Sequence, residues 1–224
     1  MTDADTRQAA LLRAMPLVFV LIWSTGFVVA RFGMPHAPPM GFLAWRFALS
    51  VLAFAVWVRV AGGTWPTERQ QWLHLSVTGV LMQAGYLGGV WAAVKAGMSA
   101  GTAALIVGLQ PLLTAVWLSV TGSRHAATPR QWAGLALGLA GLVLVVWRKL
   151  GLGEATGPSI VLALVALASI TVGTLYQKRY VVPGNVRTAN AVQLMAAFCL
   201  VLPLALLETE PVRWHPQMIG AMAW

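Results

Sequence analysis

Seven long apolar stretches restrict the fold of this chain more than any other feature of its sequence. A helix that crosses a lipid bilayer needs about 20 mostly apolar residues, with a range of about 17 to 25. Such stretches predict membrane spans at 15–32, 40–58, 73–94, 98–120, 132–147, 159–176 and 189–207, and an eighth begins near Gln217. Because backbone groups in lipid must bond to one another, we expect an all-α, polytopic transmembrane helix bundle.

Charged residues are scarce, and their placement fits these spans. Only 9% of the residues are charged and 58% are hydrophobic, whereas soluble domains carry about 25% charged residues. Most of the protein surface must therefore face lipid, so we expect the lipid bilayer as a partner. The formal net charge of +9 does not indicate a nucleic-acid partner, because the basic residues lie in short gaps between apolar stretches, where topology signals occur.

The basic residues also predict an orientation. If the N-terminus is cytoplasmic, the inner segments hold nine Lys or Arg residues and the outer segments hold five. Since cytoplasmic loops carry the excess of positive charge, we expect a cytoplasmic N-terminal tail at 1–14. A composition rich in Ala, Gly, Arg and Trp hints at a GC-rich bacterium, and hence at a bacterial plasma (inner) membrane protein.

A weak internal repeat runs through the chain. When the sequence is shifted by about 148 residues, 25–32 aligns with 173–180 and Trp65 aligns with Trp214. Each unit has five spans, an odd number, so the second unit enters the membrane from the opposite face. This arrangement is an inverted repeat, which recurs in secondary transporters.

The repeat predicts four segments. We expect the cytoplasmic tail to be followed by a first five-helix repeat at 15–148, an outer linker at 149–158 and an incomplete second repeat at 159–224. The second repeat holds two full helices and the start of a third. By the repeat length, roughly 70 residues are missing, so we expect a C-terminally truncated chain.

Four stretches carry a resemblance to a known family. They are 22–31 (IWSTGFVVAR), 45–47 (WRF), 100–111 (AGTAALIVGLQP) and 128–141 (TPRQWAGLALGLAG). They resemble the EamA-type ten-helix proteins of the drug/metabolite transporter superfamily. The resemblance implies two five-helix bundles around a central cavity, alternating access, and transport of amino acids, nucleosides or other metabolites. One departure is 122–123, Gly-Ser in this chain, where many relatives carry Gly-Glu.

The spans lack the residues that an enzyme would need. An intramembrane catalyst requires clustered nucleophiles, bases or metal ligands, and proton relays use intramembrane carboxylates. All acids lie outside the spans, the histidines are scattered, and no phosphate-binding glycine loop is present. We therefore expect no enzyme activity, no catalytic or metal site and no cofactor. The acids are Asp3, Asp5, Glu68, Glu154, Glu208 and Glu210, and the histidines are His36, His74, His125 and His215.

Arg46 is the one fully charged residue well inside a predicted span. An arginine at the centre of a membrane helix costs about 2.5–3.5 kcal/mol on insertion scales. Two explanations stay open at this point. Arg46 could face a cavity and bind a substrate carboxylate or phosphate in bidentate fashion. Alternatively, it could extend to the headgroups or pair structurally within the bundle.

Milder polar residues complete the candidate substrate site. Gln83 and Tyr86 are three residues apart, which places them on one face of an α-helix. Pro111 frees a carbonyl near Val107 and is expected to kink its helix. For each glutamine the alternative to cavity lining is an interhelical hydrogen bond, worth about 0.6–2 kcal/mol. The candidates beside Arg46 are Trp23, Gln83, Tyr86, Gln110, Tyr176, Gln177 and Gln193.

Small residues spaced by four predict close helix contacts. We expect such contacts within the bundle at Gly85 and Gly89, and at Gly134 and Gly138. A homodimer that uses the helix at 132–147 stays open as a further possibility.

Together these patterns predict an integral membrane secondary transporter or permease. The family resemblance implies that its substrate is a small polar metabolite, amino acid-like or nucleoside-like, and that it works in efflux by alternating access. The alternative is a non-transporting membrane protein or an inactive truncated fragment, since the second repeat is incomplete.

Overall fold

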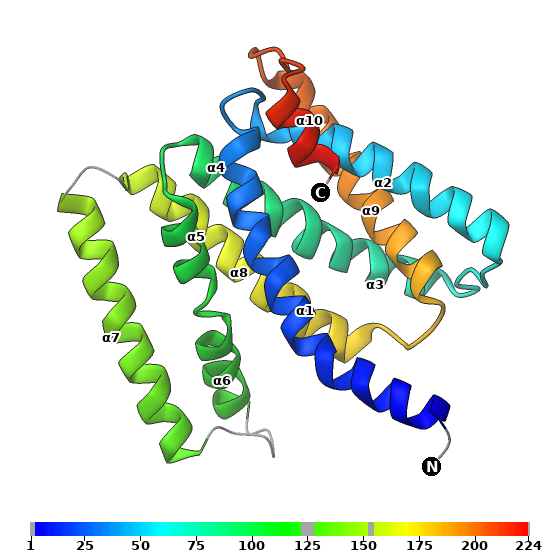
Figure 1. Cartoon of the computed structure of the whole chain (residues 1–224), viewed down its shortest axis with the longest axis horizontal. Helices are drawn as coiled ribbons and strands as arrows, with labels where there is room; N and C mark the ends of the chain where they lie inside the picture. The colour runs from blue at the N-terminus through cyan, green and yellow to red at the C-terminus, as the bar shows by residue number, and fades with distance from the viewer. Residues whose placement is uncertain (1–2, 122–127, 152–154, 224) are drawn as a thin grey trace.

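A computed structural model describes residues 3–121, 128–151 and 155–223, and within these ranges the chain forms helices joined by short connections. Figure 1 shows their arrangement. The helices are α1 (Asp3–Gly33), α2 (Pro39–Ala61), α3 (Arg69–Gly79), η1 (Val80–Gly85), α4 (Tyr86–Lys95), α5 (Ala100–Val107), α6 (Gln110–Val120), α7 (Pro129–Gly151), α8 (Gly157–Tyr180), α9 (Val186–Leu207) and α10 (Pro216–Ala223).

Seven helices in the described part of the chain are long and apolar enough to cross a membrane. The predicted all-α fold with seven full spans is therefore confirmed, and the observed ends differ from the predicted ones by a few residues. The spans are Ala14–Gly33, Pro39–Ala61, Arg69–Lys95, Ala100–Val120, Pro129–Lys149, Gly157–Tyr180 and Val186–Leu207. An eighth apolar helix, α10, begins at Pro216, close to its predicted start.

Two of the spans are interrupted. The fourth span consists of α5 and α6, with a break after Val107, where the Leu109 N–H donates to Ile106 O in a tighter turn. Pro111 lies in the first turn of α6, and proline cannot donate the hydrogen bond that would continue a helix through it. The predicted kink is thus confirmed.

The third span contains a π-helical segment, η1, between α3 and α4. The Tyr86 N–H donates to Leu81 O, five residues back, which is the π-helical pattern. The widened turn changes which residues share a face. The α-helical rule that aligned Gln83 with Tyr86 therefore does not apply across this segment.

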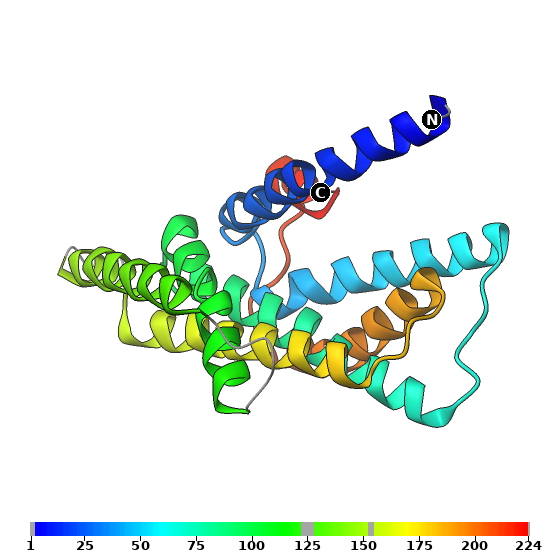
Figure 2. The same cartoon turned by 90° about the horizontal axis from the view of Figure 1, so that it is seen from below.

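The core lies between helices from the two ends of the sequence. Helix α9 packs against α2 and α3, and α8 packs against α3, η1 and α4, while α1 and α10 lie side by side over one face of this group (Figure 2). Within the candidate span of α7 only 6% is buried inside the protein, against 44% for the span that runs through α3 and α4. Phe42, Phe47, Ala166, Ala197 and Val201 are among the most buried side chains.

Glycines allow the closest approaches within this core. A Cβ atom added to Gly85 would lie 2.7 Å from Ser169 Oγ, and one added to Gly89 would lie 2.8 Å from Leu162 O. The predicted contact role of Gly85 and Gly89 therefore holds, because α4 and η1 approach α8 at these positions.

The corresponding expectation for Gly134 and Gly138 is wrong for the described residues. A Cβ atom added to either glycine would meet nothing within 4 Å. The reason is the position of α7 at the edge of the bundle, where much of its surface is open (Figure 1). A homodimer through this helix stays a prediction.

Candidate functional site

Arg46 lies against an aromatic pair inside the bundle. It is half-buried on α2, about 10 Å from the start of that helix at 1.5 Å per residue. Its guanidinium carbon is 5.9 Å from the centroid of the Trp91 ring, and Trp91 stacks on Phe42 with 4.4 Å between ring centroids. Trp91 is only 2% exposed. Cation–π attraction at such a site is stronger than at an exposed one, so the charge is held toward α4.

Two predicted site residues meet between α1 and α4. The Trp23 Nε1–H donates a hydrogen bond of 3.0 Å to the Tyr86 hydroxyl oxygen. Both side chains are half-buried. Because the Tyr86 oxygen accepts this bond, the hydroxyl proton of Tyr86 is left to donate elsewhere. Tyr86 and Trp91 both lie on α4. This helix therefore contacts Trp23 through Tyr86 and Arg46 through Trp91.

Gln83 lies within the π-helical segment. Its side chain is half-buried, with no hydrogen bond to any residue that the structure describes. Isolated π-turns within α-helices occur often at functional sites, because they re-aim side chains and backbone groups. This position therefore leaves the Gln83 amide open for another ligand.

Gln193 is the most buried of the candidates. Its side chain is 7% exposed on α9, and it makes no hydrogen bond within the described part of the chain. Its amide atoms keep some accessible surface, because among the described residues only Ser119 Oγ is a fully buried side-chain polar atom without a partner. The amide can therefore bond to water or to a substrate, so Gln193 stays a candidate for substrate contact.

Gln110 has a structural partner. Its Nε2 donates a hydrogen bond of 3.1 Å to Thr174 Oγ1, which joins α6 to α8. Gln110 also borders a cavity of about 630 Å³ between α6 and α7, together with Thr114 and Gln131. Thr174 was not predicted, because a lone threonine in an apolar helix carries no signal of its partner.

This contact supports a first prediction about stability. Gln110→Leu and Thr174→Val should each lower the free energy of unfolding, and the double variant should lose less than the sum. The expected coupling is about 0.6 kcal/mol, the average for interhelical hydrogen bonds in membranes. Unfolding of the four proteins in mixed detergent micelles measures it. Strictly additive losses would show that the bond contributes nothing.

Tyr176 belongs to a second cluster, at the end of α8. Its hydroxyl is 2.8 Å from Nδ1 of His74 on α3, and the ring of Tyr180 stacks on His74 with 5.2 Å between ring centroids. The neighbouring Gln177 is half-buried, with no side-chain hydrogen bond to a described residue. His74 was missed because the sequence shows four scattered histidines and cannot show that one of them meets two tyrosines.

The predicted site residues thus form separate groups. Trp23, Arg46 and Tyr86 lie where α1, α2 and α4 meet, while Tyr176 and Gln177 lie at the far end of α8. Among the described residues no group of three or more His, Cys, Asp or Glu side chains could hold a metal ion. The chemistry available is hydrogen bonding, cation–π contact and charge pairing, which suits binding.

Seven apolar spans within the described ranges, with a half-buried arginine on one of them, define a polytopic membrane protein. The sequence pattern of the EamA-like transporter family matches residues 12–147. The chain therefore belongs to this family, which is a family of membrane transporters and not of enzymes. The departure at 122–123 falls outside the described residues.

Curated relatives cover most of this chain. An uncharacterized inner membrane transporter, YedA, from Escherichia coli strain K12 is 25% identical over 203 residues, which are 91% of this chain and 64% of the relative. An uncharacterized transporter of Archaeoglobus fulgidus is 26% identical over 92% of this chain and 71% of its own. A protein of Salmonella typhimurium named "Probable amino-acid metabolite efflux pump" is 26% identical over 86% of this chain and 62% of its own.

The chain spans about two thirds of the length of these relatives. No solved structure gave a significant match.

Proposed function

We propose that this chain belongs to a secondary transporter that moves a small polar metabolite out of a bacterial cell by alternating access. The observation that carries the proposal is Arg46, a charge half-buried in a membrane span and held over the Trp91 ring. Charged residues within membrane segments are expensive and mark substrate or ion pathways. The enzyme alternative has no comparable support.

The proposed substrate is amino acid-like or nucleoside-like. A guanidinium binds carboxylate or phosphate oxygens in bidentate fashion, and the aromatic rings of Trp23 and Tyr86 suit the apolar part of such a molecule. The open amides of Gln83 and Gln193 can both donate and accept hydrogen bonds. The name of the relative from Salmonella typhimurium, an amino-acid metabolite efflux pump, agrees with this class of substrate.

The proposed topology is an inverted repeat. The segment at 15–148 would form the first five-helix unit, 149–158 an outer linker and 159–224 part of a second unit of opposite orientation, with the tail at 1–14 in the cytoplasm. Helix pairs from both proposed units pack together, most extensively α2 with α9. Alternating access by rocking of mirrored units about a shared site is the mechanism that such repeats support.

Counterflow in proteoliposomes tests the proposed function. Liposomes preloaded with a mixture of unlabelled amino acids or of nucleosides should take up a radiolabelled member of the same class when they contain the full product of the gene that encodes this chain. The 224-residue chain is measured beside it. Uptake with neither protein, for every labelled class, would contradict transport of these substrates.

A non-transporting role is the second candidate. The observation that favours it is the open surface of α1 and α7, whose candidate spans are only 11% and 6% buried. If the full gene product transports and the 224-residue chain does not, the activity depends on contacts that would cover the open surfaces of α1 and α7.

Gln193 supplies a prediction that separates substrate contact from packing. Gln193→Leu should raise KM by about fivefold or more, since a hydrogen bond to the substrate is lost. The same change should leave the unfolding free energy unchanged or higher, because the Gln193 amide has no hydrogen-bond partner among the described residues that the change would remove. Gln110→Leu is the matched control, with lower stability and KM within about twofold. If Gln193→Leu destabilises the protein and leaves KM unchanged, Gln193 is a structural residue.

A further inference from the structure

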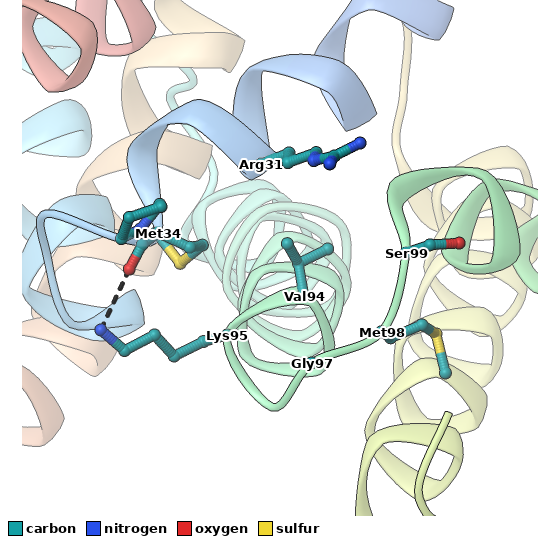
Figure 3. Close-up of a pocket in the computed structure, with 8 residues that line it drawn as sticks. Arg31, Met34, Val94, Lys95, Gly97, Met98 and Ser99 are labelled. Atoms are coloured by element: carbon teal, nitrogen blue, oxygen red, sulfur yellow. Dashed lines mark hydrogen bonds between the residues drawn. The ribbon is translucent and has the colours of Figure 1, made fainter. Parts of the chain in front are cut away.

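A cavity of about 670 Å³ opens where α1 and α4 end and α5 begins. Its lining includes two basic side chains from different helices, Arg31 of α1 and Lys95 of α4, together with Val94, Met98 and Ser99 (Figure 3). None of the lining residues is acidic. The cavity is separate from the group around Arg46, since neither Arg46 nor Trp91 lines it.

The two basic residues are used differently. Arg31 extends from α1 toward the side of the cavity on which Ser99 lies (Figure 3) and forms no hydrogen bond or ion pair with a described residue. Lys95 is also a lining residue, but its side chain extends toward Met34, in the opposite direction from the Arg31 side chain in Figure 3; its ammonium donates to Met34 O at 3.0 Å and pairs with Glu210 at 2.7 Å. Glu210, which lies in the connection between α9 and α10, therefore neutralises the positive charge that Lys95 would otherwise offer to an anion.

The ion pair between Lys95 and Glu210 is exchangeable. Both side chains are partly exposed, 30% for Lys95 and 38% for Glu210, and pairs of this kind contribute little net stability. The segment that carries Glu210 has other attachments. Glu208 accepts the Gly41 N–H at 2.7 Å, and the Arg213 N–H donates to His36 O at 2.8 Å. Glu210 can thus leave Lys95 without release of the segment.

We propose that this cavity is an anion-binding site, in which a carboxylate or phosphate group binds between Arg31 and Lys95 and displaces Glu210 from Lys95. Arg31, together with Lys95 once Glu210 has left it, offers two positive charges beside a cavity whose lining holds no acid, and such charges attract an anion. The displaced Glu210 carboxylate turns to water, which the partial exposure of both partners permits. The ligand group is supplied either by a soluble anion or by the headgroup of an anionic lipid, since the cavity lies at the end of membrane-spanning helices.

Binding of radiolabelled inorganic phosphate to the purified chain tests this site. The protein is immobilised in neutral detergent at fixed ionic strength, and binding is measured by scintillation proximity. Arg31→Gln and Lys95→Gln should each weaken binding by about fivefold or more, because each removes a charge-assisted hydrogen bond. Glu210→Gln should tighten binding by about threefold, because the competing carboxylate is gone. Arg59→Gln, the same charge change at the opposite end of α2, should change it by less than about twofold.

Lys95→Gln should weaken phosphate binding and Glu210→Gln should tighten it. These opposite effects distinguish an anion-binding site from an ion pair that only stabilises the fold. If Glu210→Gln weakens binding or leaves it unchanged, or if Arg31→Gln binds as the unaltered chain does, the proposal is overturned. The Arg31 variant keeps the test valid even if Lys95→Gln fails to fold, because Arg31 has no hydrogen bond or ion pair with a described residue to lose. Saturable binding must also be present in the unaltered protein, and its absence would overturn the proposal.

Nanodiscs identify the source of the anion. Discs of phosphatidylcholine alone should retain phosphate binding. If added phosphatidylglycerol competes with phosphate in the unaltered chain and in Arg59→Gln, but not in Arg31→Gln, the ligand is a lipid headgroup. Phosphate binding that is unaffected by phosphatidylglycerol assigns the site to a soluble anion.

Discussion

Replacement of Arg46 by glutamine is expected to reduce the counterflow rate by about tenfold or more. The variant keeps a polar side chain of similar length but loses the charge. Hydrogen bonds to charged groups contribute about 1.5–3 kcal/mol, and 1.4 kcal/mol corresponds to a factor of ten. The initial rate in proteoliposomes that contain the full gene product, with equal amounts of inserted protein, measures the effect.

Arg59→Gln is the matched control for this prediction. Arg59 lies on the same helix, in its last turn, and is exposed. Its loss removes the same charge without a change near Trp91, so transport should stay within about twofold. An Arg46→Gln protein that inserts and transports as the unaltered protein does would remove the main support for the proposed function.

Gly79→Ala is expected to have the largest effect on folding. A Cβ atom at Gly79 would lie 2.5 Å from the Cα atom of Gln193 and closer still to its carbonyl oxygen. These are backbone atoms, so α3 and α9 must move apart. Overpacking usually costs about 1–3 kcal/mol and occasionally more, and we expect a loss of about 3 kcal/mol. Thermal unfolding of the purified chain in detergent measures it.

Gly138→Ala provides the comparison, because an added methyl group there meets nothing within 4 Å. Alanine also favours the helical state over glycine. This variant should unfold at the same temperature as the unaltered chain or slightly higher. If Gly79→Ala unfolds at the temperature of Gly138→Ala, the close approach of α3 and α9 is contradicted.

The elements that the sequence predicted correctly are those that depend on local chemistry. Span lengths follow from the bilayer thickness, and the break before Pro111 follows from the missing N–H of proline. The π-turn at 80–85 was not predictable, because the sequence carries no signal that this segment packs against both α8 and α9. Its consequence is specific: Tyr86 meets Trp23, while Gln83 does not share that contact.

The sequence indicated which polar residues could form the candidate site, but not which residues they would contact. For every glutamine the sequence allowed either cavity lining or an interhelical hydrogen bond. The structure shows which glutamines have a hydrogen-bond partner among the described residues. Gln110 bonds to Thr174, whereas Gln193 is buried without a described partner. Partners such as Thr174 and His74 depend on which helices become neighbours. That choice is made by side-chain packing over the whole bundle, which periodicity does not encode.

The proposed opposite orientation of the two repeats can be tested by cysteine accessibility. In a Cys199→Ser background, Thr67→Cys places a thiol in the connection before α3, and Gly157→Cys places one at the start of α8, both at exposed positions. Three spans separate them. In intact cells a membrane-impermeant maleimide should label residue 157 and should label residue 67 only after permeabilisation. Labelling of both positions from the same side would contradict the inverted repeat, and with it the proposed mechanism of alternating access.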